Sequence, residues 1–151
     1  MRHLRVGVVG SRRRCTLRDR QIVFDLVQSL MDADPERKIT FVSGKCRLGA
    51  DNFVAEAVRL FKDEYGDRID LVEYPPKTYP GMSRYEFTLA AYERNREIAV
   101  DSDVGYALVH RDRTGGTENT VGHYHDLVKP VYLVDDAGRS YLESEHEGDP
   151  T

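Results

Sequence analysis

Three segments of the sequence combine glycines with hydroxyl side chains, a composition suited to binding phosphate or ribose. They are "GSRRRCT" from residue 10, "SGKCRLGAD" from residue 43 and "RTGGTENT" from residue 113. Glycines let the backbone turn sharply and approach a ligand, and the N–H and O–H groups of such loops are preorganised donors to an anion. A capped turn between a strand and a helix has the same composition, so each segment alone leaves both interpretations open.

The candidate ligand-binding residues come from these segments. In the first, Gly10 permits a sharp turn, Ser11 offers a hydroxyl near a helix start, and Arg12 can complete a phosphate cradle. In the second, Asp51 is able to cap the following helix. The candidates are Gly10, Ser11, Arg12, Ser43, Gly44, Lys45, Gly49, Asp51, Gly115, Gly116, Thr117 and Thr120. The first segment lacks the G-x-G-x-x-G pattern of a dinucleotide-binding turn.

A fourth candidate element, "RNREI", contains an arginine on the apolar row of a predicted helix. Arg94 lies four residues before Ile98, so both side chains share one face. An inward arginine needs a carboxylate, a carbonyl or a ligand anion as its partner. If one helix runs unbroken from about 84 to 100, Arg94 lies along it, away from the ligand edge. If the helix restarts near Ala91, Arg94 and Asn95 reach the pocket.

Other kinds of chemistry have no recognisable pattern in this chain. Cys15 and Cys46 are too few for a disulfide framework. His123 and His125 lie about 200° apart on a helix, without a cysteine or carboxylate set around them. We therefore expect no metal and no cofactor. The spacing shows no Ser/His/Asp triad, although such a triad is a spatial arrangement that spacing does not exclude.

The elements that must position these residues alternate between strands and helices. Short apolar stretches bounded by turn residues predict strands at 4–10, 38–44, 69–74, 104–110 and 130–134. Apolar residues at helical spacing predict a helix after each of the first four strands. This alternation implies right-handed crossovers and a parallel sheet with helices on both faces. We expect a doubly wound α/β three-layer sandwich with a five-stranded, mainly parallel sheet of order 3-2-1-4-5.

The order of elements places the candidate residues at one edge of that sheet. Ligands of doubly wound sheets bind beyond the carboxyl ends of the strands, and all three glycine-rich segments directly follow strands. The length of 151 residues suits one domain. We predict this domain at 1–142 and an acidic, flexible tail at 143–151. No apolar stretch has the length of a signal peptide or membrane span, which predicts a cytoplasmic protein with reduced thiols.

The start of the chain is rich in arginine. Residues 2–20 carry seven arginines against one acid. Arg13 and Arg14 fall in a loop, where rim or partner contacts are as compatible with the sequence as solvent. Arg18 and Arg20 fall in the predicted helix and are expected to face solvent. The chain as a whole has a net charge of −4, which argues against a general nucleic-acid coat because such proteins need cationic excess.

The ordered motifs "VGVVGSR", "FVSGKCRLGADNFVAEAV", "RNREIAVDSDVGYAL" and "GGTENTV" followed by "KPVYLV" resemble those of the SLOG superfamily, particularly its YspA/YpsA-related branch, over residues 4–134. The resemblance implies a Rossmann-like domain that binds nucleotides or their derivatives. Relatives include LOG-type phosphoribohydrolases and the Smf/DprA DNA-processing proteins. It implies ligand contacts at Gly10, Ser11, Arg12, Ser43, Gly44, Gly49, Asp51, Arg94, Asn95, Gly116, Thr117 and Thr120.

The sequence departs from this pattern at two places. Lys45 stands where the family usually has a second glycine, which adds a cation at the ligand edge. Thr120 stands at the position of the LOG-type catalytic glutamate, and Glu118 is out of register to replace it. The second departure speaks against LOG-type hydrolysis.

Three functions remain compatible with these features. The leading hypothesis is a nucleotide-binding module, with a sensing or signalling role and self-association into a homo-oligomer. The first alternative is an enzyme that cleaves an N-glycosidic bond of a nucleotide, with Asp51 or Glu97 stabilising an oxocarbenium-like transition state or activating water. The second alternative is single-stranded DNA binding through the arginine-rich start.

Overall fold

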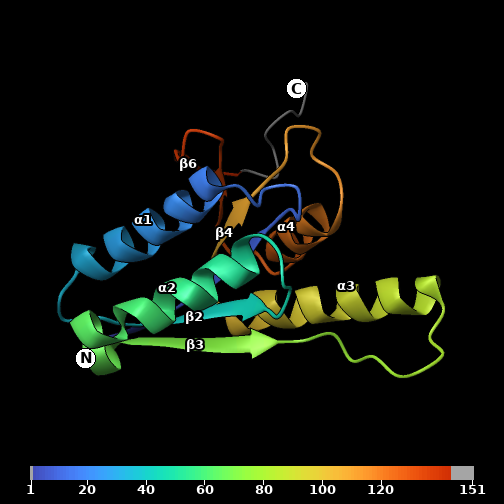
Figure 1. The fold of residues 1–151 in the computed structure, drawn as a ribbon, viewed down its shortest axis with the longest axis horizontal. Helices are drawn as coiled ribbons and strands as arrows, with labels where there is room; N and C mark the ends of the chain where they lie inside the picture. The colour runs from blue at the N-terminus through green and yellow to red at the C-terminus, as the bar shows by residue number, and fades with distance from the viewer. Residues whose placement is uncertain (1, 144–151) are drawn as a thin grey trace.

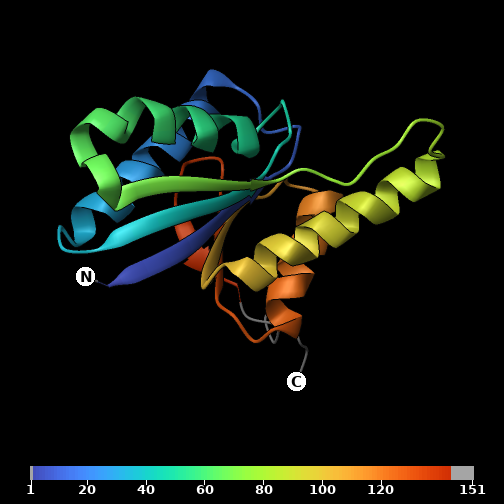
Figure 2. The same cartoon turned by 90° about the horizontal axis from the view of Figure 1, so that it is seen from below.

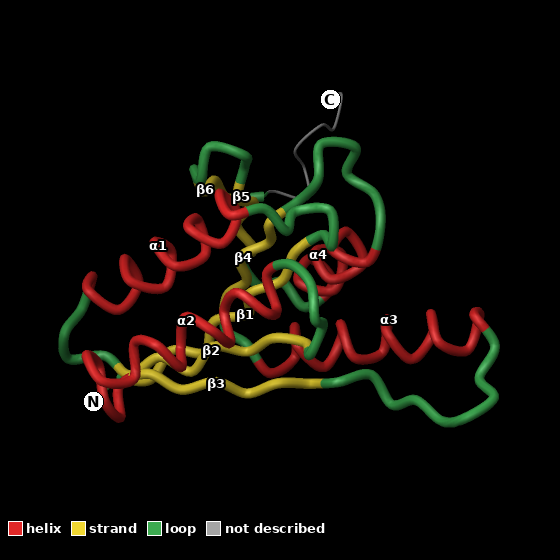
Figure 3. The backbone as a smooth tube through the Cα atoms, in the orientation of Figure 1, coloured by secondary structure: helices red, strands yellow, loops and turns green. Residues whose placement is uncertain are grey.

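The computed structural model describes residues 2–143, which form one six-stranded sheet flanked by helices (Figures 1 and 3). The strands are β1 (His3–Gly10), β2 (Lys38–Gly44), β3 (Ile69–Tyr74), β4 (Val104–Leu108), β5 (Val131–Val134) and β6 (Ser140–Leu142). Their order is β3-β2-β1-β4-β5-β6, and every neighbouring pair is parallel except β5 and β6. The predicted α/β class and strand order 3-2-1-4-5 are confirmed, and the fold is Rossmann-like.

Helices cover both faces of this sheet. They are α1 (Leu17–Ala33), α2 (Ala50–Tyr65), α3 (Arg84–Asp101) and α4 (Gly116–Asp126), with a short 3₁₀ helix at Gly66–Arg68. Figure 2 shows α1 and α2 on one face and α3 and α4 on the other, which gives three layers. Within residues 2–143, no helix has the length and apolar character needed to cross a membrane.

The sixth strand was not predicted from the sequence. After β5 the chain turns through residues 135–139 and pairs antiparallel, with Ser140 opposite Val134. This strand has only three residues, all exposed, so it lacks the apolar alternation by which strands are recognised. The predicted acidic tail lies outside the described residues except for Glu143, whose amide donates to the Val131 carbonyl at 2.9 Å.

The two faces of the sheet have different cores. Aliphatic side chains such as Val23, Val27 and Met31 fill the space between the sheet and the helices α1 and α2. On the other face the Tyr124 ring of α4 lies against the sheet at Gly105, where a Cβ atom would come within 2.5 Å of the ring. Glycine is therefore needed at position 105 so that α4 can pack closely on the sheet.

The helix starts fall into two kinds. Capping boxes start α1 and α3, with Thr16 and Ser83 accepting from backbone N–H groups three residues later. By contrast, α2 and α4 follow Gly49 and Gly115, which have φ of 78° and 100° and provide no side-chain cap. Both glycines lie at the carboxyl edge of the sheet, so these starts leave their first-turn N–H groups without a side-chain cap there.

Candidate functional site

A cleft of about 310 Å³ lies beyond the carboxyl ends of β1 and β4, between α3 and the start of α4; we call it the first cleft. Most of the predicted site residues line it. These are Gly10, Ser11, Arg12, Asp51, Arg94, Asn95, Gly115, Gly116, Thr117 and Thr120. The structure thus brings together residues from four separate segments, as the rule for doubly wound sheets predicts.

The other predicted site residues lie outside this lining. Ser43 and Gly44 support residues that line the first cleft, as described below, Gly49 directly precedes α2, and Lys45 lines a neighbouring cleft. Glu97, the second candidate carboxylate, lines neither cleft. Asp51 is therefore the only acidic side chain that the structure, as far as it describes the chain, places on the first cleft.

The carboxylate of Asp51 is held by groups from the end of β2. The Ser43 hydroxyl lies 2.9 Å from Asp51 Oδ1 and also 2.9 Å from the Val8 carbonyl, and the Cys46 amide donates to Oδ2 at 3.1 Å. Burial raises the pKa of Asp51, although Ser43, the nearby Arg94 charge and the Cys46 amide oppose the shift.

A protonated Asp51 satisfies this arrangement fully. The Ser43 hydroxyl has one proton, which it can donate either to Val8 or to Asp51. When Asp51 carries a proton, it can donate to Ser43 while Ser43 donates to Val8. A carboxyl group with a raised pKa that opens onto a cleft is suited to general acid or general base chemistry.

Gly44 is the point at which Asp51 and Arg94 approach one another. A Cβ atom at Gly44 would lie 2.6 Å from both Arg94 Nη1 and Asp51 Oδ2. The absence of a side chain at this strand end therefore lets a guanidinium and a carboxylate occupy the same edge. Side-chain packing therefore gives one reason for a glycine after Ser43.

Arg94 and Asn95 connect the end of β3 to the start of α4. Arg94 Nη1 donates to the Tyr74 carbonyl at 3.3 Å, and its Nε donates to Asn95 Oδ1 at 3.0 Å. The Asn95 amide nitrogen donates in turn to the Gly116 carbonyl at 3.3 Å and to Asn119 at 3.2 Å. This chain of contacts fixes both side chains in the wall of the first cleft.

The two alternatives considered for Arg94 were both wrong in part. Helix α3 runs unbroken from Arg84 to Asp101, yet Arg94 and Asn95 line the first cleft. Figures 1 and 2 show the reason: the first half of α3 projects past the carboxyl ends of the strands. A residue halfway along this helix therefore lies level with the edge of the sheet.

The start of α4 forms the opposite wall of the first cleft. Gly115 has φ of 100° and α4 lacks a side-chain cap, so its first N–H groups meet the cleft at the positive end of the helix dipole. Thr117 is buried beside them, while the Thr120 hydroxyl donates back to the Gly116 carbonyl at 3.2 Å. This wall is suited to an anion such as a phosphate group.

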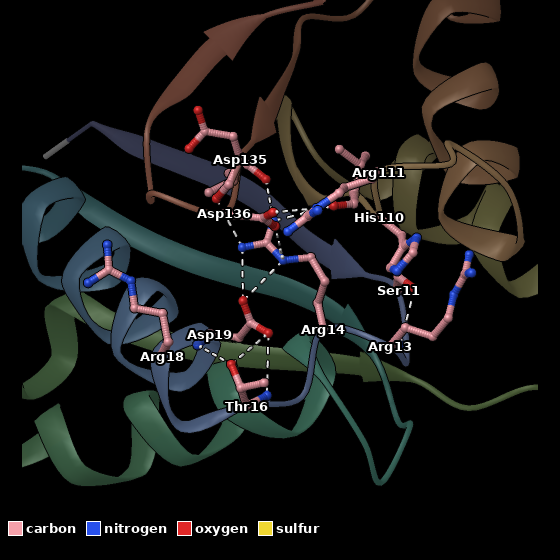
Figure 4. A network of polar contacts seen from close by, with 12 residues as sticks. Ser11, Arg13, Arg14, Thr16, Arg18, Asp19, His110, Arg111, Asp135 and Asp136 are labelled. Carbon is pink, nitrogen blue, oxygen red and sulfur yellow. Dashed lines mark hydrogen bonds and ion pairs between the residues drawn. The ribbon is translucent and has the colours of Figure 1, made fainter.

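The three arginines after Ser11 have different environments, and Figure 4 shows two of them, Arg13 and Arg14. Arg14 is buried and paired with Asp19 at 2.9 Å, so it is neither a rim residue nor solvated. Arg13 forms a bidentate pair with Asp112 at 2.6 and 2.8 Å. Arg12 is exposed and makes no hydrogen bond or ion pair within residues 2–143. Arg12 and Arg13 both line the first cleft, and Arg12 is the one whose guanidinium has no partner among the described residues.

The later arginines of this run have partners as well. Arg18 is exposed, as predicted, and donates to the Ala137 carbonyl at 3.2 Å. The prediction of a solvent-facing Arg20 was wrong, because its guanidinium pairs with Glu56 of α2 and lies 4.2 Å from the centre of the Phe24 ring. An interhelical contact of this kind depends on how α1 and α2 pack.

A second cleft of about 600 Å³ adjoins the first and shares Arg12, Cys46, Ala91 and Arg94 with it. Lys45, Arg47 and Phe87 also line this second cleft. Sequence reasoning missed Cys46, which lies within the second glycine-rich segment but carries a thiol, and Phe87, which lies outside these segments. The basic composition around Lys45 was the one sequence signal for this cleft.

Comparison with known proteins adds no assignment. No protein-family model matches the chain, and no curated protein matches it either. Within residues 2–143, no group of three or more His, Cys, Asp or Glu side chains is arranged to hold a metal ion. The features that bear on function are therefore the fold, with strand order 3-2-1-4-5-6, and the two clefts at its carboxyl edge.

Proposed function

We propose that this protein binds a nucleotide or nucleotide derivative in the first cleft. The observation that carries the proposal is the start of α4, whose first-turn N–H groups lack a side-chain cap and meet the cleft close to Arg12. Helix N-termini of this kind bind phosphate groups. The phosphate of the nucleotide would lie against Gly116 and Thr117, with the guanidinium of Arg12 contributing the counter-charge.

The rest of the first cleft suits a nucleoside. Asp51 and Asn95 offer polar groups to ribose hydroxyls, while Ile98 and Ala91 supply apolar surface for a base. The resemblance of the ordered motifs to the SLOG superfamily, and to its YspA/YpsA-related branch, supports the same proposal, and we propose membership of that superfamily. A sensing or signalling role would follow from ligand binding without turnover.

Thermal unfolding with added ligand tests this proposal. Nucleoside monophosphates and ADP-ribose-like compounds would be screened, and a ligand at about 100 times its Kd is expected to stabilise the native state by about 2.7 kcal/mol. Arg12→Gln should abolish the shift. Arg18→Gln removes the same charge from an exposed side chain outside both clefts and should retain it. An Arg12 variant that still responds like the unmodified protein, or no response to any compound, would contradict the proposal.

Hydrolysis of an N-glycosidic bond is the second candidate, favoured by the raised pKa of the Asp51 carboxyl. Glu118 pairs with Arg113 at 2.7 Å and lies outside the first cleft, which gives no support to a LOG-type glutamate. Chromatography for free base after incubation with nucleoside monophosphates and with NAD tests this candidate. Release of base that Asp51→Asn abolishes is the expected result, and unchanged substrates would exclude the tested reactions.

One proposal about partners follows from the surface. The projecting half of α3 exposes apolar side chains, including Tyr85, Phe87 and Leu89, which supports self-association of the chain. Light scattering after gel filtration tests it, since a monomer at all concentrations would contradict it. The contacts give little support to DNA binding, because Arg13 and Arg14 already pair with acids of the protein.

A further inference from the structure

We propose that the ligand carries a second phosphate group, which binds in the second cleft against Lys45 and Arg47. This inference rests on the proposed nucleotide binding in the first cleft and specifies the class of nucleotide. The two clefts share Arg12 and Arg94, so a ligand can extend from one into the other between these two guanidinium groups.

The charge of the second cleft is the first argument. Its lining includes four cationic side chains, Arg12, Lys45, Arg47 and Arg94, and no acidic side chain among the described residues. The chain as a whole has a net charge of −4, so this concentration of positive charge is local. Clefts lined by one sign of charge attract ligands of the opposite sign.

The second argument is that three of these four cations have no internal partners among the described residues. Arg12, Lys45 and Arg47 make no side-chain hydrogen bond or ion pair within residues 2–143. Most arginines elsewhere in this part of the chain do, as Arg5 does with Asp101 at 2.8 Å. Cations that tie elements of the fold together contact its carboxylates or carbonyls, as Arg68 does with three backbone carbonyls, whereas these three line a cleft with their donors unpaired in the described part of the chain.

The third argument concerns the division of charge between the clefts. Asp51 lines the first cleft and is absent from the lining of the second. A second phosphate beside Asp51 would meet a like charge whenever that carboxyl is ionised. The first cleft, at about 310 Å³, is also at the lower end of the range of roughly 300–1,000 Å³ for small-molecule sites. Both facts direct a second phosphate to the neighbouring cleft.

Apolar residues complete the second cleft. Leu48, Pro76 and Phe87 line it beside the cations. Apolar walls lower the local dielectric constant and strengthen ion pairs formed next to them. Phosphate contacts made there are expected to contribute more than the same contacts on an open surface.

Calorimetric titration with three adenosine and three guanosine nucleotides tests this inference. For each base the compounds are the 5′-monophosphate, the 5′-diphosphate and the 3′,5′-bisphosphate. At least one two-phosphate compound is expected to bind about tenfold more tightly than its monophosphate, because hydrogen bonds between charged groups are stronger than those between neutral groups. Comparison of the 5′-diphosphate with the 3′,5′-bisphosphate shows whether the second phosphate is attached to the first phosphate or to the 3′ position of the ribose.

A double variant assigns the gain to the second cleft. Lys45→Gln/Arg47→Gln should bring the affinity ratio between the two-phosphate compound and the monophosphate close to one. Arg59→Gln/Arg96→Gln removes the same charge from exposed side chains outside both clefts and should leave that ratio unchanged. Thermal unfolding of both variants without ligand checks that they fold.

The outcomes separate this inference from the proposal on which it rests. Equal affinity for one-phosphate and two-phosphate compounds overturns the second phosphate site and leaves nucleotide binding standing. A ratio that survives Lys45→Gln/Arg47→Gln, or that falls equally in the control variant, also overturns it. If none of these nucleotides binds, both the proposed function and this inference are overturned for adenine and guanine nucleotides.

Discussion

Arg14 and Arg94 lie at the same carboxyl edge of the sheet, but their surroundings differ. Arg14 is buried, with Asp19 at 2.9 Å and the Asp135 carbonyl at 2.9 Å, and a further bond to the Val134 carbonyl. Arg94 is half-buried and has two hydrogen bonds, to Asn95 and to the Tyr74 carbonyl. Its side chain also lines both clefts, whereas Arg14 lines neither.

This difference separates an arginine that holds the fold together from one that is available to a ligand. The Arg14 contacts tie the β1–α1 loop to the end of β5, and they leave no open surface for a second partner. Arg94 keeps part of its guanidinium facing the clefts. We therefore expect substitutions around Arg14 to reduce stability and substitutions around Arg94 to reduce binding.

Replacement of the two arginines by methionine should show the largest contrast. Arg14→Met leaves Asp19 buried without its partner and is expected to lower the free energy of unfolding by about 3–5 kcal/mol. Arg94→Met loses two hydrogen bonds at a partly exposed site and should cost about 1–2 kcal/mol. Urea denaturation of both variants measures the difference. Equal losses of unfolding free energy in the two variants would show that Arg14 and Arg94 contribute equally to stability.

The pH dependence of stability tests the environment of Asp51, next to Arg94. Because burial raises the pKa of Asp51, the folded protein holds a proton that the unfolded chain releases at a pH of about 4. The unfolding free energy of the unmodified protein should therefore fall, relative to Asp51→Asn, as pH rises above that value. Urea denaturation of both proteins, repeated at about every pH unit from roughly pH 4 to 8, checks the direction of this change. A constant difference would contradict a raised pKa.

The two capping boxes extend the comparison to helix starts. Thr16 accepts from the Asp19 amide at 3.1 Å and orients the carboxylate that pairs with Arg14. Ser83 caps the projecting end of α3, which is exposed. Thr16→Ala is expected to cost about 1–2 kcal/mol and Ser83→Ala about 0.5–1 kcal/mol. Thermal or urea unfolding measures both changes. A larger loss of unfolding free energy for Ser83→Ala would contradict the expectation that the Thr16 cap contributes more to stability.

A methyl group at Gly44 should have a small effect on stability and a clear effect on binding. The added Cβ would collide with the outer atoms of Arg94, which can move, and with the Asp51 carboxylate, which Ser43 and Cys46 hold in place. Gly44→Ala should lower the free energy of unfolding by about 1 kcal/mol, the low end of the cost of overpacking. It should weaken nucleotide binding, measured by calorimetry, because both cleft residues are displaced. Unchanged affinity would show that their positions do not matter for the ligand.

Sequence patterns predicted most of the fold because the signals are local. Strands such as "KITFVSG" are short, β-branched and bounded by turn residues, and the alternation with helices restricts the sheet to few topologies. Ten of the fourteen predicted ligand-binding residues line the first cleft, since every loop after a parallel strand reaches the same edge. The three-residue β6 has no comparable signal.

The residues that sequence patterns misplaced depend on distances between elements. Whether Arg94 reaches the edge depends on how far α3 projects past the strands, and helical spacing does not contain that displacement. The burial of Arg14 likewise requires the end of β5, more than 100 residues later in the chain, to lie beside the β1–α1 loop. Glu97 shares a helix with Arg94 but lines neither cleft.

By itself, the sequence determined the first five strands and their order, the four helices, and the edge at which glycine and hydroxyl groups gather. These depend on local backbone preferences and on the handedness of crossovers, both of which are encoded in neighbouring residues. Only the tertiary structure decided which arginines are paired and which are left to a ligand. Whether a guanidinium can bind a ligand depends on which carboxylates and carbonyls of the protein come within hydrogen-bond distance of it. Many of those partners come from distant parts of the chain.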